Sequence, residues 1–231
     1  MKNMAKLFWI IFLYFCQYSF IKGFLLPNEF RNVVDILETN NGGQFGTWRD
    51  DQYCARSTYA VGYRIKVQSS QGSDDDTALN GITLVCATVN GSFGGDITSG
   101  IGEFGSWHSP AYCPHDDPHG VEVMVQFRLK VEPDMGGDDD TSANDIEFQC
   151  WDLHARLHTV PTVSNVNDQG GQLAGDTVHA PGGLANGNWA SSNRCPVNSA
   201  ICGIQTRVET FLSDRGDDSA LNDVKFFCCQ D

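Results

Sequence analysis

The most regular pattern in this chain is an alternation of apolar and mostly polar residues with a period of two. It is longest over residues 121–131, where the odd-numbered positions are Val, Val, Val, Phe, Leu and Val. Shorter runs repeat it at 82–86, 146–150 and 224–228. Side chains two residues apart share one face of a β-strand, so these runs predict strands that each have one apolar face. No helical period competes with them after residue 24, and 24 glycines supply turns.

These runs belong to a larger pattern that occurs three times. Each copy opens with Gly-x-Trp and places a cysteine six residues after the tryptophan. Each continues with an alternating run, an acidic turn and an asparagine, and closes with a cysteine six residues after that asparagine. Such a repeat predicts one all-β domain with pseudo-threefold symmetry, in which three antiparallel sheets bury a shared core. We place the copies at about 42–90, 101–155 and 183–231.

The first 23 residues have the layout of a secretory signal peptide. Lys2 and Lys6 precede a nine-residue apolar run over residues 7–15. This run is shorter than the roughly 20 apolar residues that span a bilayer, and it fits the apolar region of a signal peptide. We predict a signal peptide at 1–23 and a single mature domain at 24–231, which makes the protein secreted and extracellular. A retained N-terminal anchor is the alternative.

Removal of this segment leaves a strongly acidic chain. The formal net charge of the full chain is −14, and loss of Lys2, Lys6 and Lys22 leaves 12 basic against 29 acidic residues, a net charge near −17. Binding to nucleic acid requires a positive surface, so nucleic acid is excluded as a partner. The charge disfavours anionic membranes and suits cationic partner proteins in the same fluid.

The cysteine count indicates disulfides. Nine cysteines become eight when Cys16 leaves with the signal peptide, and an even number in a secreted chain predicts four bonds. A zinc site is disfavoured because the sequence has no CxxC motif. No cofactor is expected.

The repeat narrows the pairing, because the first and last cysteines of each copy are natural partners. This predicts the bonds Cys54–Cys86 and Cys113–Cys150. The third copy holds four cysteines, two of which are adjacent and must point to opposite faces of a strand. The order in which its two early cysteines pair with its two late ones stays open; the four are Cys195, Cys202, Cys228 and Cys229.

The three tryptophans of the repeat are Trp48, Trp107 and Trp189. A tryptophan buries about 150–250 Å² of surface, and three equivalent ones could fill the interior of the fold or cap one end. The alternative is that they are platforms on which sugar rings stack. We favour core packing, because a residue needed in every copy is usually needed by the fold, and keep all three as candidate binding residues.

The acidic turns are the candidates for acid–base chemistry. They contain Asp74–Asp76, Asp138–Asp140 and the pair at 217–218. Aspartate stabilises tight turns by accepting backbone hydrogen bonds, which is the interpretation we favour. Calcium binding and glycoside chemistry are the alternatives, and the second needs two carboxylates on either side of the scissile bond. The candidate catalytic residues are Asp75, Asp139 and Asp218.

Three further motifs invite a local interpretation. Asn80, Asn144 and Asn222 follow the acidic turns, and we expect them to bond the backbone where a strand begins. Residues 115–119 read His-Asp-Asp-Pro-His, which we interpret as a solvated loop before the long strand rather than as a metal cluster. Asn90-Gly-Ser92 is the single glycosylation sequon of the chain.

The repeat also resembles a known family. The segments that carry the resemblance are Asn41-Gly-Gly-Gln-Phe-Gly-Thr-Trp48, Asp74-Asp-Asp-Thr-Ala-Leu-Asn80, Ile201-Cys-Gly-Ile-Gln-Thr-Arg-Val-Glu209 and Phe226-Phe-Cys-Cys229. Together they are similar to the vitelline membrane outer layer protein 1 family from about Val33 to the C-terminus. The resemblance implies a β-prism, three sheets around a pseudo-threefold axis, where spacing alone leaves a trefoil or a sandwich open.

The resemblance also implies a function. The first expectation is a secreted, disulfide-stabilised structural or binding protein of an extracellular coat or fluid, whose partners are coat proteins or glycans. The alternative is a lysozyme-like transglycosylase that acts on N-acetylglucosamine oligomers, and a third option is a lectin. Sugar affinity without turnover would favour the lectin, and transfer products would favour the enzyme.

Overall fold

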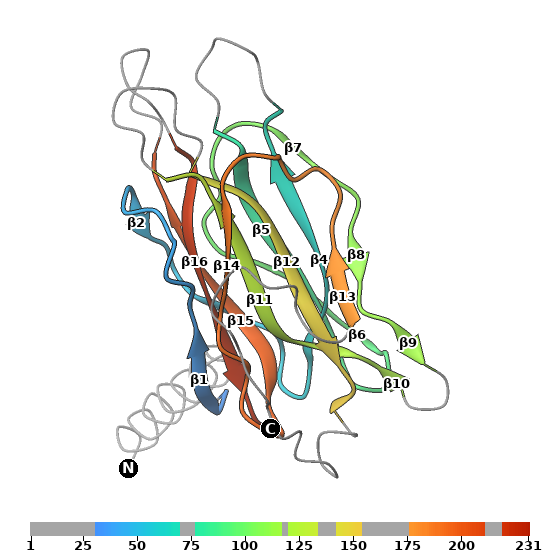
Figure 1. Ribbon diagram of the computed structural model, residues 1–231. Coiled ribbons are helices and arrows are strands. Elements are labelled where there is room, and N and C mark those ends of the chain that lie inside the picture. Colours follow the sequence, from blue (N-terminus) through green and yellow to red (C-terminus); the bar gives the residue numbers. More distant parts are fainter. Residues whose placement is uncertain (1–30, 70–76, 117–119, 134–141, 154–175, 211–218) are drawn as a thin grey trace, which may run out of the picture. The chain divides into compact units, whose positions relative to one another are not determined.

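The alternating runs form the long strands of three antiparallel sheets (Figure 1). The computed structural model describes residues 31–69, 77–116, 120–133, 142–153, 176–210 and 219–231. The predicted signal peptide lies outside these residues. In the part of the chain that is described, no helix has the length and apolar character needed to cross a membrane.

Each sheet is built on a pair of nine-residue strands. In sheet I the strand order is β6-β5-β4-β7, and β8 also pairs with β4; in sheet II it is β13-β12-β11-β14; in sheet III it is β1-β16-β15-β2, and β3 also pairs with β15. The bounds of sheet I are β4 Tyr59–Val67, β5 Leu79–Ala87, β6 Phe93–Thr98, β7 Ser106–Trp107 and β8 Ala111–Tyr112. Those of sheet II are β11 Val123–Val131, β12 Ala143–Trp151, β13 Asp176–His179 and β14 Asn188–Ser191. Those of sheet III are β1 Val33–Leu37, β2 Thr47–Trp48, β3 Gln52–Tyr53, β15 Ala200–Val208 and β16 Leu221–Cys229.

The sheets do not coincide with the sequence copies. The leading strands of the first copy, β2 and β3, pair with β15 of the third copy. Those of the second copy, β7 and β8, pair with β4 of the first, and β14 of the third copy pairs with β11 of the second. Each copy therefore completes the sheet of its neighbour, and the exchange closes in a ring.

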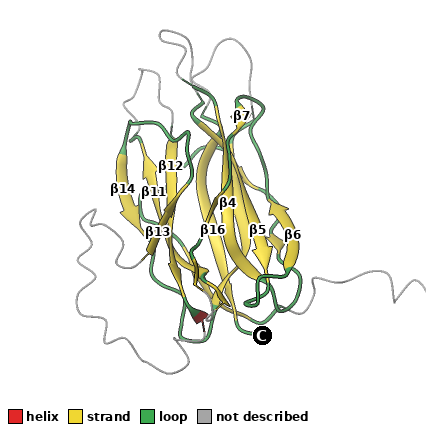
Figure 2. Ribbon diagram, turned by 90° about the vertical axis from the view of Figure 1, so that its right-hand side faces the viewer, coloured by secondary structure: helices red, strands yellow, loops and turns green. Residues whose placement is uncertain are grey.

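The apolar faces of the three sheets meet in one core, as the alternation predicts. Figure 2 shows sheets I and II on either side of the view, with β16 of sheet III between them. Phe127, Phe148 and Phe226 are fully buried and their rings contact one another edge to face or tilted, at centroid distances of 4.8 to 6.3 Å. Tyr63 joins them, and its hydroxyl donates to the carbonyl of Ile146 at 2.7 Å. The architecture is a β-prism.

The long run at 121–131 is interrupted, which the period-two pattern did not predict. The strand β11 begins at Val123, while Val121 belongs to a separate short hairpin of β9 (His115–Asp116) and β10 (Gly120–Val121). A register shift between Met124 and Gln126 then changes which residues face inward. Equivalent shifts follow Ala60 in β4 and Ile201 in β15. A β-bulge adds one residue and bends the strand, so the alternation cannot continue through it.

Four disulfides are present, and they confirm the predicted pairs Cys54–Cys86 and Cys113–Cys150. The open question in the third copy resolves to Cys195–Cys228 and Cys202–Cys229. Three of the bonds are equivalent. In each, the first cysteine lies at the edge of one sheet and the second lies in a long strand of the next sheet, so the three bonds join sheets III and I, I and II, and II and III. The bond Cys202–Cys229 instead joins two strands of sheet III.

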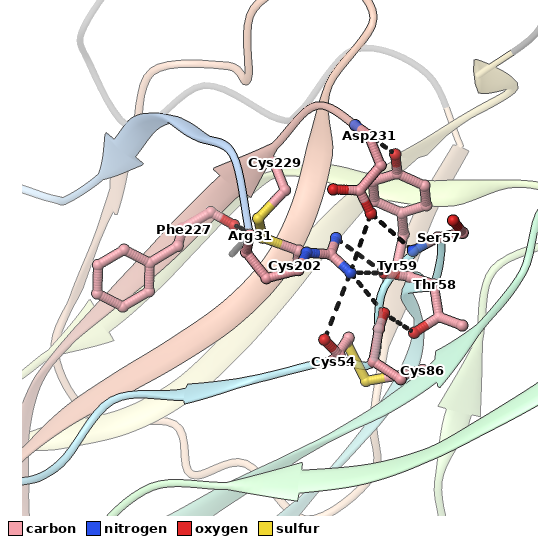
Figure 3. A network of polar contacts seen from close by, with 11 residues as sticks. Arg31, Cys54, Ser57, Thr58, Tyr59, Cys86, Cys202, Phe227, Cys229 and Asp231 are labelled. Carbon is pink, nitrogen blue, oxygen red and sulfur yellow. Dashed lines mark hydrogen bonds and ion pairs between the residues drawn. A yellow bond between two sulfur atoms is a disulfide. The ribbon is translucent and has the colours of Figure 1, made fainter. Parts of the chain in front are cut away.

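The two ends of the described unit meet at the first of these bonds (Figure 3). The guanidinium of Arg31 donates to the carbonyls of Cys54 at 3.3 Å and Thr58 at 3.1 Å, and it lies 3.3 Å from the carboxylate of Asp231, the last residue. The side chains of Arg31 and Asp231 are 2% and 7% exposed. The same carboxylate accepts from the backbone of Ser57 at 2.6 Å. A buried charge needs such partners, so this cluster fixes the loop that follows Cys54.

Candidate functional site

The tryptophans of the repeat do not fill the core, contrary to the interpretation that we favoured. Each lies at an edge of a sheet, where Trp107 is 36% exposed and the other two are partly exposed. Each also contacts a cation. The guanidinium of Arg64 lies 5.1 Å from the Trp107 ring and that of Arg128 lies 4.5 Å from the Trp189 ring, while Lys225 lies 4.5 Å from the Trp48 ring. The phenylalanines and Tyr63 occupy the axis instead.

Carboxylates lie at equivalent places in two of the sheets, where Asp145 is buried and Asp223 is partly buried. Asp145 accepts from His179 at 2.9 Å, and this hydrogen bond raises the pKa of the histidine. At the equivalent place in sheet III, burial raises the pKa of Asp223 to about 6, and repulsion from Glu38 adds to the effect. A side chain added at Gly42 would meet that carboxylate at 2.2 Å, so the glycine loop packs directly on it. These acids are covered by the fold.

The predicted catalytic residues, Asp75, Asp139 and Asp218, lie outside the described residues, so the structure does not test them. The asparagines that follow are described and are fully buried. Each donates to a backbone carbonyl: Asn80 to Ala78 at 3.1 Å, Asn144 to Ser142 at 3.2 Å and Asn222 to Ser219 at 2.9 Å. Their role in bonding the start of the strand is confirmed.

One row of residues on the outer face differs among the three sheets. In sheet I the row runs across four strands as Tyr112, Gly62, Val85 and Asp96, each opposite the next in register. Gly62 has a reason to be glycine, because a Cβ there would lie 2.4 Å from the Tyr112 ring. The tyrosine ring therefore packs directly against the strand at Gly62.

Sheet III closes the corresponding row with aromatic packing. Its residues are Tyr53, Gly203, Phe227 and Ile36. Tyr53 covers Gly203 as Tyr112 covers Gly62, but its ring also contacts that of Phe227 at a centroid distance of 5.1 Å. Phe227 is 7% exposed. The Tyr53 and Phe227 rings thus cover this position of the outer face.

Sheet II closes the row with polar groups. Gln126 stands in the glycine position and lies opposite Gln149. The guanidinium of Arg194 donates to the side chain of Gln149 at 2.5 Å and lies 5.4 Å from the Trp151 ring. The outer surface here is filled by side chains that bind one another.

Sheet I holds a hollow at this row, where the smaller Val85 stands in the place that Phe227 and Gln149 occupy in the other sheets. The hollow has a volume of about 450 Å³. Its walls include Tyr112, which is 56% exposed, and Phe93, which is 72% exposed. Val85 and Val61 lie in its floor and are almost completely buried. Two aromatic faces thus stand exposed over an apolar floor.

A five-residue insertion builds another wall. Tyr63 follows Cys54 by nine positions and Ile204 follows Cys195 by nine, but Phe127 follows Cys113 by fourteen. The extra length forms the β9–β10 hairpin, which lies beside β6 at one end of sheet I (Figure 1). The amide of Val121 donates to the carbonyl of Val89 at 3.2 Å, which joins the hairpin to the β5–β6 turn.

Sequence reasoning missed this site. It interpreted residues 115–119 as a solvated loop, whereas His115 lies in β9, is exposed and lines the hollow. The insertion in the second copy was the signal that could have found it. His119 lies outside the described residues. Within the ranges that are described, no cluster of three or more histidine, cysteine, aspartate or glutamate side chains could hold a metal ion.

The polar groups of the hollow suit a ligand with many hydroxyls. Arg64 and Asp96 line it, and their charged ends lie 4.0 Å apart with side chains 40% and 43% exposed. The guanidinium supplies donors and the carboxylate supplies acceptors. Aromatic faces carry partial negative charge and attract the C–H face of a ring lying over them. A concave site with an apolar floor and a few placed polar groups is the usual form of a small-ligand site.

The family is shown by sequence. A model of the family described as vitelline membrane outer layer protein I (VOMI) matches residues 35–231. The chain belongs to the vitelline membrane outer layer protein I family. It is 35% identical over 199 residues to the vitelline membrane outer layer protein 1 homolog of Mus musculus, covering 85% of this chain and 84% of that protein. The Homo sapiens homolog is 33% identical over 199 residues, covering 84% and 83%.

Solved structures that are similar to this family member have low sequence identity to it. A mannose-specific jacalin-related lectin from Morus nigra, in complex with mannose, is 13% identical with a TM-score of 0.44, covering 88% of this chain and 99% of the lectin chain. The complex of artocarpin with mannopentose gives 12% identity and a TM-score of 0.46, covering 86% and 99%.

Proposed function

We propose that this protein is a secreted, disulfide-stabilised component of an extracellular coat or fluid that binds glycans in the hollow of sheet I. The observation that carries the proposal is the exposed ring of Tyr112, which packs against Gly62 and lines a hollow with buried valines. Arg64 and Asp96 line the same hollow and supply a donor and an acceptor for the hydroxyls of a sugar. The family name and the four disulfides support the extracellular setting.

Binding is favoured over catalysis at this site. A glycosidase or transglycosylase of the common kind needs a pair of carboxylates about the scissile bond. The described lining of the hollow contains one, Asp96. The transglycosylase alternative therefore stays a prediction that depends on Asp75, Asp139 and Asp218.

The test is titration of the purified mature protein with chitotetraose by calorimetry, alongside an array of oligosaccharides that contain N-acetylglucosamine, galactose or mannose. We expect saturable binding that Tyr112→Ala weakens at least tenfold and Asp96→Asn weakens severalfold. Phe45→Ala is the matched control, because Phe45 is 50% exposed and is not part of the hollow. Its affinity should equal that of the wild type.

Two results would overturn the proposal. One is the absence of binding to every oligosaccharide of the array by a protein whose folding is verified by circular dichroism. The other is binding that Tyr112→Ala leaves unchanged. Mass spectrometry of the chitotetraose after incubation separates the enzyme, since longer and shorter oligomers would establish glycosyl transfer.

A further inference from the structure

We propose that an N-linked glycan on Asn90 lies across the mouth of the hollow and competes there with external glycans. The inference rests on the proposed function, because it concerns how access to the same site is regulated. In this proposal, the affinity for external glycans depends on whether Asn90 is glycosylated. Its evidence is the position and bonding of the β5–β6 turn.

The sequon lies at the tip of a tight, well-bonded turn. The amide of Gly91 donates to the carbonyl of Thr88 at 2.8 Å, and the amide of Ser92 donates to the Thr88 hydroxyl at 3.0 Å. Thr88 in turn donates its amide to the carbonyl of Ser92 at 2.9 Å. Asn90 is the exposed residue between them. A sequon asparagine on an exposed turn is open to modification.

This turn is also part of the rim. Gly91, the middle residue of the sequon, and Phe93, the residue after it, both line the hollow. Gly91 has a φ of +83°, and a Cβ there would lie 3.2 Å from Val121 of the β9–β10 hairpin. The turn is therefore pressed against the opposite wall, and a sugar attached to Asn90 begins at the edge of the opening.

Phe93 gives that sugar a surface to lie on. Its side chain is 72% exposed, the highest value among the large apolar residues of the described chain. Covering an aromatic ring this exposed with an apolar face removes it from water, which is favourable. The first N-acetylglucosamine has a C–H face and an acetyl methyl group of the right kind. A glycan that rests on Phe93 also narrows the opening toward Tyr112.

Competition follows from simple mass action. A tethered group has an effective concentration at its own site that can reach the millimolar range. A weak contact of the Asn90 glycan with the hollow can therefore lower the apparent affinity for an external glycan severalfold. Removal of the tethered sugar restores it.

The experiment compares wild-type protein from a glycosylating eukaryotic host with Ser92→Ala from the same host. Ser92→Ala removes the sequon but keeps Asn90 and the backbone bonds of the turn. Intact mass gives the occupancy of Asn90. Hydrogen exchange over residues 88–98 reports the contact without any added ligand, and calorimetry with chitotetraose reports the competition. Endoglycosidase trimming to a single N-acetylglucosamine separates the first sugar from the distal ones.

We expect an occupied Asn90, slower exchange over 88–98 in the glycosylated protein, and affinity for chitotetraose at least threefold higher in Ser92→Ala. Phe93→Ala in the glycosylated protein should abolish the exchange difference. An unmodified Asn90, or equal affinity and equal exchange in the two proteins, would overturn the inference and leave the proposed function standing. Slower exchange without binding of any added glycan would support the contact and overturn the external binding.

Discussion

The outer faces of sheets I and III carry equivalent rows of residues, but the row of sheet I lines a hollow and that of sheet III is covered by aromatic packing. Both have a tyrosine ring packed against a strand glycine, Tyr112 against Gly62 and Tyr53 against Gly203. In sheet III the neighbouring Phe227 closes the surface, while in sheet I the smaller Val85 leaves it open. The fold fixes the glycine and the tyrosine, and one side chain beside them decides between a packed surface and a hollow.

The loops beside these rows differ in the same way. After Cys54 the loop is short and is fastened by buried Arg31 and Asp231. After Cys113 the loop is five residues longer and forms the β9–β10 hairpin that lines the hollow. A position that serves stability in one copy is thus available for recognition in another.

The largest expected effect comes from the bonds that join the sheets. We expect Cys113→Ala/Cys150→Ala and Cys195→Ala/Cys228→Ala each to lower the free energy of unfolding by about 2–5 kcal/mol, because either change releases the unfolded chain. Denaturant titration measures the loss. Only the first pair should also weaken chitotetraose binding, since Cys113 lines the hollow. Equal effects of the two pairs on affinity would contradict the assignment of the site to sheet I.

The next effect comes from the fastened loop of the first copy. Asp231→Ala leaves the guanidinium of Arg31 buried without its carboxylate, and we expect a loss of about 2–3 kcal/mol in the free energy of unfolding. Glu38→Gln is the control, because its ion pair with Lys225 is exposed and contributes less than about 1 kcal/mol. Neither change should alter the affinity for chitotetraose. A loss of affinity in Asp231→Ala would mean that the two loops are coupled.

Exchanging the side chains of Val85 and Phe227 tests whether they account for the difference between the outer faces of sheets I and III. Phe227→Val removes a buried ring contact, which should lower the free energy of unfolding by about 1–3 kcal/mol. Val85→Phe should fill the hollow, change stability by less than about 1 kcal/mol and abolish binding of chitotetraose. The double variant opens sheet III but gives it no hairpin, so binding should not return. Calorimetry that shows full affinity in Val85→Phe would place the ligand elsewhere.

The smallest expected effect is a dependence of the free energy of unfolding on pH, which comes from Asp223 in sheet III. The pKa of Asp223 is raised to about 6 by burial, so the folded protein holds this proton over a range where the unfolded chain has lost it. Stability from this group is present near pH 4 and is lost as the pH rises to about 6. Asp223→Asn should therefore stabilise the protein at pH 7.5 by about 1 kcal/mol, after allowance for solvent screening, and hardly at all at pH 4. Thermal melts at the two pH values measure the difference, and an equal change at both would show that the carboxylate is not the cause.

Much of the fold could be predicted from the sequence because the same pattern of strands and cysteines occurs in all three copies. The alternating runs gave the long strands, and the copy-by-copy cysteines gave the pairs Cys54–Cys86 and Cys113–Cys150. The exchange of leading strands was not predictable, because a hydrogen-bonded neighbour leaves no mark in spacing. The bulge after Met124 was also missed, since a bulge keeps residues apolar while it changes the direction of their side chains.

The site was harder to predict because it depends on departures from the repeat. The positions that all three copies share pointed to the tryptophans as candidate binding residues and to the acidic turns as candidate catalytic residues. Val85 is an ordinary strand residue until it is compared with Phe227 and Gln149 in register. The core assignment of the tryptophans was wrong for a related reason. A residue can be needed in every copy at a sheet edge, where Trp107 and Trp189 meet arginines, as well as at the axis.

The exchange of leading strands has a consequence for how the chain could be divided. The three equivalent disulfides each lie within one copy, at 54–86, 113–150 and 195–228. A chain cut between copies would give three cross-linked fragments that hold together only by completing one another's sheets. One such fragment has an open edge on one side and a donated strand on the other, which is the head-to-tail geometry of a cyclic trimer. The single polypeptide thus has the arrangement of a cyclic trimer whose three subunits are joined end to end. A designed peptide that contains one copy is expected to assemble as that trimer.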